Sequence, residues 1–168
     1  MFHVVVAFLS VLACLKWGDW RNWRLYYPTI LYFFFVELAY NVLTNEKPLW
    51  LYNSSALNHT LTELLTSLVI FPCTILIYLP LVSRKFISQL LYTLLGIFIY
   101  SVVEYLSYLM GYFSYLNGWN IFFSILFNCV MFPILCIHHK KPLIGVLTTA
   151  AGAALMIWYF KIPVMQLR

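Results

Sequence analysis

Apolar residues dominate the chain in six long runs, which short polar or basic segments separate. The runs cover residues 2–16, 25–43, 57–82, 87–110, 120–138 and 142–161. Because a membrane-crossing helix needs about 20 mostly apolar residues, the pattern predicts an all-α polytopic membrane protein, a bundle of six transmembrane helices. The 168 residues then form a single transmembrane domain, residues 1–168, with no room for a soluble domain.

Composition supports the same class. Hydrophobic residues make up 64% of the chain and charged residues only 9%, whereas a soluble domain carries roughly 25% charged residues. A cytosolic enzyme and a disordered chain are therefore excluded. The basic residues stand at the ends of the runs and form no stripe, so the lipid bilayer is the expected partner and nucleic acid is not.

Basic residues also divide unequally between the two ends of the predicted bundle. Three belong to one end, namely Lys47, Lys161 and Arg168. Seven belong to the other, namely Lys16, Arg21, Arg24, Arg84, Lys85, Lys140 and Lys141. The positive-inside rule places the richer end in the cytoplasm and both termini outside, as expected for a multi-pass protein of the plasma membrane.

Three glutamates, Glu37, Glu63 and Glu104, lie inside predicted spans, each about six residues from the outer end, or roughly 9 Å at ~1.5 Å per residue. A charged carboxylate facing lipid costs about 2.5–3.5 kcal/mol, so we expect all three to face the bundle interior. Together with neighbouring polar residues they predict a pocket that opens to the outside. The candidate ligand-binding residues are Glu37, Asn41, His59, Glu63, Glu104, Asn120 and Asn128.

Several functions fit such a pocket. The leading hypothesis is binding or passage of a small cation or cationic solute, because nearby carboxylates repel one another unless a cation or a proton is bound. A divalent metal ion is a second possibility, with His59, Glu63 and Glu104 (or Glu37) as ligands. That site would suit a metal-dependent membrane-embedded hydrolase. A structural or assembly role, in which polar contacts lock the bundle, is the third hypothesis.

Catalytic signatures are missing from the sequence. It contains no HExxH, no GxSxG, no Walker motif and no glycine-rich dinucleotide loop. This pattern favours a protein that is not an enzyme.

The segment between the first two runs mixes tryptophan with basic residues. Trp17, Trp20, Arg21, Trp23 and Arg24 stand within eight positions. Such residues anchor helices at the membrane interface, and Asp19 is expected to pair with an arginine there. Recognition of anionic lipid headgroups is the alternative.

The remaining signals are local. Pro72 and Pro133 are expected to kink their spans, Asn58 to cap a helix, and Asn117-Gly118 to form a turn. The sixth run carries small residues that permit close helix contact and offer a route to an oligomer, namely Gly145, Thr149, Gly152 and Ala153.

A set of short motifs resembles an uncharacterised family of small multi-spanning membrane proteins from spore-forming Firmicutes. The motifs are Gly18-Asp19-Trp20-Arg21, Tyr27-Pro28-Thr29, Leu57-Asn58-His59-Thr60 followed by Glu63, Phe71-Pro72, Glu104, Asn117-Gly118-Trp119-Asn120, Phe127-Asn128 and Met131-Phe132-Pro133. The resemblance implies a bacterial plasma-membrane setting and assigns no catalytic role.

Overall fold

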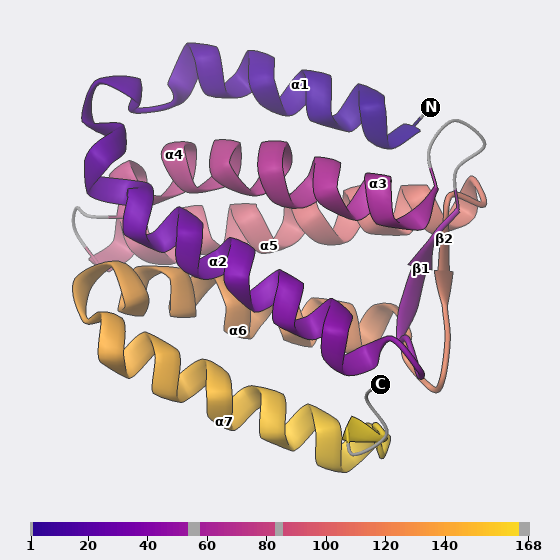
Figure 1. Cartoon of the computed structure of the whole chain (residues 1–168). Helices are drawn as coiled ribbons and strands as arrows, with labels where there is room; N and C mark the ends of the chain where they lie inside the picture. Colours follow the sequence, from indigo (N-terminus) through magenta and orange to yellow (C-terminus); the bar gives the residue numbers. More distant parts are fainter. Residues whose placement is uncertain (1, 54–57, 83–85, 165–168) are drawn as a thin grey trace.

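The computed structural model describes residues 2–53, 58–82 and 86–164 and is almost entirely helical (Figure 1). Arg84, Lys85 and Arg168, which contribute to the predicted charge asymmetry, lie outside the described residues. So does Leu57, the first residue of the predicted third span.

Six long helical segments follow one another along the chain. They are α1 (Phe2–Trp17), α2 (Trp23–Thr44), a continuous segment of α3 (His59–Leu65), η2 (Thr66–Ile70) and α4 (Phe71–Val82), then α5 (Phe86–Leu109), α6 (Ile121–Lys140) and α7 (Pro142–Phe160). The predicted all-α membrane bundle is therefore confirmed. Each helix forms where an uninterrupted apolar run lets every backbone polar group pair within the segment.

Four of the described segments are each long and apolar enough to cross a membrane: His59–Val82, Phe86–Leu109, Ile121–Lys140 and Pro142–Phe160. The N-terminal helices α1 and α2 meet the same criterion only as a pair. They are joined through the short helix η1 (Trp20–Asn22) and bent by 89°. By length and composition, the described residues thus contain four membrane-crossing helices, or five if the bent pair counts as one span, whereas the sequence predicted six.

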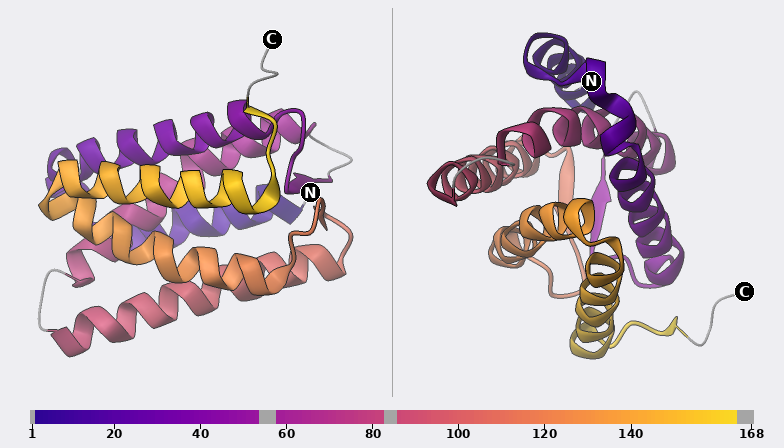
Figure 2. Two further views of the ribbon diagram at one scale, coloured as in Figure 1. Left: turned by 90° about the horizontal axis from the view of Figure 1, so that it is seen from below. Right: turned by 90° about the vertical axis from the view of Figure 1, so that its left-hand side faces the viewer.

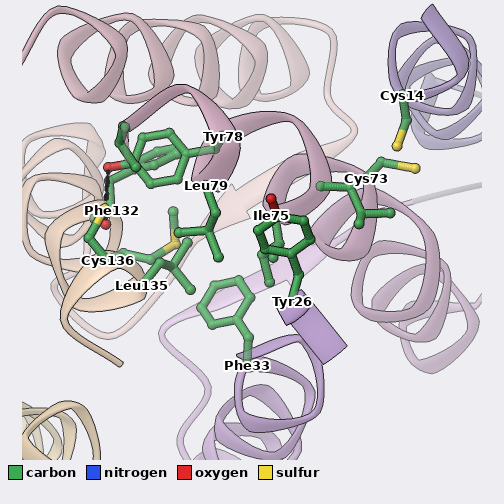
Figure 3. Close-up of a cluster of buried hydrophobic side chains, with 13 residues drawn as sticks. Cys14, Tyr26, Phe33, Cys73, Ile75, Tyr78, Leu79, Phe132, Leu135 and Cys136 are labelled. Carbon is green, nitrogen blue, oxygen red and sulfur yellow. Dashed lines mark hydrogen bonds between the residues drawn. The ribbon is translucent and has the colours of Figure 1, made fainter. Parts of the chain in front are cut away.

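Helix α4 is the centre of the bundle and packs against α1, α2, α5 and α6, while α7 packs against α6 (Figure 2). The main apolar core lies where α2, α4 and α6 meet. In Figure 3 Tyr78 and Phe132 stand edge to face, with ring centroids 5.0 Å apart, and Leu79 and Leu135 fill the space beside them. The core therefore fixes α4 relative to α6.

A two-stranded antiparallel sheet closes one end of the bundle. Strand β1 (Trp50–Tyr52) pairs with β2 (Phe113–Tyr115) in the register Trp50↔Tyr115 and Tyr52↔Phe113. Beyond β2 the predicted turn is present, since Asn117 and Gly118 both have positive φ (50° and 89°). The sheet itself was not predicted. It joins the loop after α2 to the loop after α5, and the first and last described residues lie at the same end (Figure 1).

The prolines have different local consequences. Pro72 is the second residue of α4, and the π-helical turn η2 ends two positions before it. Wider turns of this kind are a common site of helix bending. Pro133 lies inside α6, which is helical without a break from Ile121 to Lys140. Pro28 lies inside α2 because that helix begins at Trp23, earlier than the predicted start at residue 25.

Candidate ligand-binding cavity

A cavity of about 360 Å³ runs along α4, with α1 and α5 among its walls. At the end nearest the sheet, residues from α2, α6 and both strands complete the lining. Most of the polar side chains gather at that end, namely His3, Glu37, Tyr52, Thr66, Glu104, Ser107, Ser124 and Asn128. The opposite end is lined mainly by apolar side chains, including Ala13, Ile77, Leu81 and Leu95.

Glu104 on α5 is held by a hydrogen bond from the sheet. The Tyr115 hydroxyl, on β2, donates to Glu104 Oε1 at 3.0 Å. Ser124 on α6 lies near the same carboxylate. Trp119 Nε1 donates to Ser124 Oγ at 2.8 Å and so positions the serine side chain. Glu104 is therefore a fixed acceptor at the cavity wall.

Tyr115 is suited to this role as a donor. Burial raises the pKa of its hydroxyl, and the charge of Glu104 raises the pKa further. The phenol consequently stays protonated and can donate to the carboxylate.

Glu37 lines the same cavity from α2 but differs from Glu104 in its surroundings. Among the described residues, no hydrogen-bond donor and no cationic side chain contacts its carboxylate. As a whole residue Glu37 is half-buried. The Glu37 carboxylate is thus free to accept hydrogen bonds from a ligand.

The charges of all three glutamates affect the pKa of one tyrosine, Tyr52 of strand β1. Burial raises the pKa of the Tyr52 hydroxyl well above its usual value, and the charges of Glu37, Glu104 and Glu63 raise the pKa further. The side chain of Thr66 lies near the Tyr52 hydroxyl and partly opposes this rise in the pKa. Three helices therefore bring their carboxylates within electrostatic reach of one point at the sheet end.

His3 contributes an imidazole to this end of the cavity. Its side chain lines the cavity and is only 7% exposed. Nε2 is 3.3 Å from Ser107 Oγ, and the ring stands edge-on to Tyr52 at 4.9 Å. Nδ1 is buried and has no hydrogen-bond partner in the described structure. An unpaired buried nitrogen costs about 1–3 kcal/mol, so it calls for a partner.

His59 and Glu63 form a separate pair one helical turn apart. His59 Nε2 lies 3.1 Å from Glu63 Oε1, and His59 Nδ1 accepts a hydrogen bond from the Tyr52 backbone N–H at 3.2 Å. Glu63 and Asn41 line a second, smaller cavity of about 100 Å³ between α2 and α3. The predicted single pocket is thus divided into two neighbouring cavities.

The predicted metal site does not assemble. In residues 2–53, 58–82 and 86–164, no group of three His, Cys, Asp or Glu side chains is placed to hold a metal ion. Glu104 lines the main cavity and accepts a hydrogen bond from Tyr115, whereas His59 and Glu63 pair with each other. The pairing of β1 with β2 places Tyr115 beside Glu104. Glu104 therefore accepts a hydrogen bond from Tyr115 and does not join His59 and Glu63 in a metal site.

Asn120, a predicted ligand-binding residue, lies outside the lining of the main cavity and caps a helix. Its Oδ1 accepts hydrogen bonds from the backbone N–H groups of Phe122 and Phe123 at 3.0 and 3.3 Å, so the side chain caps α6. Asn58 caps α3 in the same way, as predicted. Asn128 does line the main cavity, where its Nδ2 lies 3.4 Å from Ser101 Oγ.

The tryptophan-rich segment lies at the opposite end of the bundle from the sheet. Trp17, Trp20 and Trp23 are all exposed, and Arg24 lies over the Trp23 ring. Arg21 is exposed as well. These positions suit side chains at a membrane interface.

Asp19 in the same segment does not pair with an arginine as predicted. Its carboxylate accepts hydrogen bonds from Asn22 Nδ2 and the Tyr26 hydroxyl, each at 3.0 Å. The Asn22 bond lowers the pKa of Asp19. The short η1 turn places Asn22 and Tyr26, rather than an arginine, within reach of Asp19.

Sequence patterns missed two residues of the cavity lining, His3 and Tyr52, and the residue that donates to Glu104, Tyr115. His3 stands in the apolar run 2–16, where nothing marks it as polar lining. Tyr52 and Tyr115 fall in two loops 63 positions apart, and a pairing of three-residue strands leaves too little periodicity to detect. The aromatic character of both loops was the only available signal.

Comparisons with protein-family models, with curated proteins and with solved structures find no match to this chain.

Proposed function

We propose that this integral membrane protein binds a small cationic solute, one that carries an ammonium group, at the polar end of the main cavity. The observation that carries the proposal is the unpaired carboxylate of Glu37 in a cavity shared with Glu104. In the described part of the chain the only ion pair is His59–Glu63, so no lysine or arginine neutralises these two glutamates.

An ammonium group suits the chemistry of this end better than a bare metal ion does. It carries N–H donors, and the unpaired Glu37 carboxylate in the cavity is an acceptor that one ammonium group can satisfy. A metal cation such as magnesium needs several oxygen ligands. Within the part of the chain that the structure describes, no group of three His, Cys, Asp or Glu side chains is placed to hold a metal ion.

Binding is favoured over passage through the membrane. Away from the sheet, polar side chains along the cavity are already bonded to one another: Thr74 to Tyr100 at 2.6 Å and Tyr78 to Thr93 at 2.8 Å. A permeating cation would need free polar groups along its path. The cavity therefore serves as a site with one polar end.

Thermal unfolding of the purified protein in detergent tests the proposal, with ethylammonium chloride as the probe and sodium chloride replacing it at constant ionic strength. At a hundredfold excess over Kd, ligand binding stabilises a protein by about 2.7 kcal/mol, which corresponds to a rise in Tm of roughly 5–10 °C. Glu37→Gln should weaken binding at least tenfold, because a charged hydrogen bond contributes about 1.5–3 kcal/mol.

The matched control is Glu46→Gln, which removes the same charge from an exposed loop position outside the cavity. It should bind ethylammonium like the unmodified protein. No rise in Tm, or an equal loss in both variants, would refute the proposed function.

The proposal also includes an orientation in the bacterial plasma membrane, with the sheet end and both termini outside. Labelling of single cysteines tests this orientation. The cysteines replace Asn117 or Lys141 in a variant that lacks the four native cysteines. Both positions are exposed, and they lie beyond opposite ends of α6. An impermeant thiol reagent should label the Asn117 cysteine in intact cells and the Lys141 cysteine only after permeabilisation. The reverse result would invert the topology.

A further inference from the structure

The shape of the main cavity bears on which cationic solute it takes. Its lining on α5 extends from Tyr92 to Ser107, which corresponds to about 22 Å at ~1.5 Å per residue. On α1 the lining extends from Phe2 to Ala13. A volume of about 360 Å³ drawn out over this length is long and narrow. A compact cation such as ethylammonium would occupy only one end.

The two ends of the cavity also differ in the polarity of their lining. Among the described residues, the carboxylate of the lining without a hydrogen-bond partner is that of Glu37, at the sheet end. At the other end Ala13, Ile77, Leu81 and Leu95 present hydrocarbon. The middle section offers hydroxyls that are already paired, such as Thr74 with Tyr100. A ligand that fills the cavity must therefore be polar at one end and apolar along the rest.

We infer that the ligand is a cationic amphiphile, a long-chain alkylammonium compound whose head binds at Glu37 and whose hydrocarbon tail lies along α4 between α1 and α5. The inference rests on the proposed function and adds the class of ligand. Charge complementarity selects the head, because an anionic or zwitterionic head would place negative charge beside two glutamates. The tail gains packing contacts along walls that a small cation leaves empty.

The first experiment compares alkylammonium chlorides of two to twelve carbons, with Kd measured by titration in nanodiscs. Ala13→Leu reduces the space at the apolar end and leaves the head site unchanged. Ethylammonium should bind this variant and the unmodified protein equally, whereas dodecylammonium should bind the variant at least fivefold more weakly. Ala151→Leu, at an exposed position on α7 outside the cavity, is the matched control and should change neither affinity.

A second measurement needs no variant. Dodecylammonium with a diazirine on its terminal carbon should, on irradiation, label peptides around Ala13, Ile77 and Leu81, and excess ethylammonium should reduce the labelling. Labelling confined to the lipid-facing surface of α7, or labelling that ethylammonium does not reduce, would overturn the inference.

The outcomes separate the two proposals. If ethylammonium binds in a Glu37-dependent manner but Ala13→Leu affects short and long chains alike, the inference fails and the proposed function stands. If ethylammonium does not bind, the proposed function fails. If dodecylammonium binds Glu37→Gln as tightly as it binds the unmodified protein, its tail alone holds it. That result would contradict both the proposed function and the inference about the ligand.

Discussion

Replacing Gly145 by alanine is expected to lower the free energy of unfolding by about 1–3 kcal/mol. A Cβ at Gly145 would lie 2.6 Å from both the Cα and the Cβ of His138 and 3.0 Å from its backbone nitrogen. Backbone atoms cannot rotate out of the way as a flexible side chain can, so α7 would have to move away from α6. Thermal or denaturant unfolding of the purified protein in detergent measures this loss.

His138 has little freedom to yield to such a Cβ. Its Nδ1 lies 3.1 Å from Thr29 Oγ1, and its ring stacks on Tyr32 with centroids 3.8 Å apart. The Tyr32 hydroxyl in turn bonds to Thr149. A shift of His138 would therefore break contacts among α2, α6 and α7. In the predicted stripe of small residues, Gly145 and Thr149 thus serve packing within the chain.

Gly152 provides the control because it undergoes the same substitution on the same helix. A Cβ there would meet no atom within 4 Å. Since alanine is favoured over glycine inside a helix by about 1 kcal/mol, Gly152→Ala should be neutral or slightly stabilising. Equal destabilisation by the two substitutions would contradict the close approach of α7 to His138.

Phe132→Ala is expected to cost on the order of 2–3 kcal/mol, at about 24 cal/mol for each Å³ of cavity left behind. Phe132 is 1% exposed, and its ring stands edge to face against Tyr78 at 5.0 Å and Tyr100 at 5.3 Å. In a membrane the loss comes from packing rather than from transfer out of water, because lipid tails are as apolar as the ring. Unfolding in detergent measures it.

Phe122→Ala is the matched control on the same helix, since its side chain is 67% exposed. A lipid-facing phenylalanine has its lost contacts replaced by lipid, so the change should remain within about 0.5 kcal/mol. A loss at Phe122 as large as that at Phe132 would show that α6 is not anchored through its Phe132 face.

Much of the architecture follows from the sequence by itself. Runs of about 20 apolar residues have few options other than helices in a bilayer, because each backbone polar group must pair within its own segment. The local signals are equally direct. Asn58 caps α3, Asn117-Gly118 forms a turn, and His59 meets Glu63 because positions four apart share one helix face. The glutamates within the spans likewise marked the polar end.

Only the tertiary structure decided how these residues are used. Pairing of β1 with β2 joins loops distant in sequence, and it places Tyr115 on Glu104 and Tyr52 within reach of three carboxylates. The fold also leaves His3 Nδ1 without a partner and Glu37 unpaired. Helical periodicity says which residues share a face of one helix, but which faces meet depends on contacts between segments far apart in the chain.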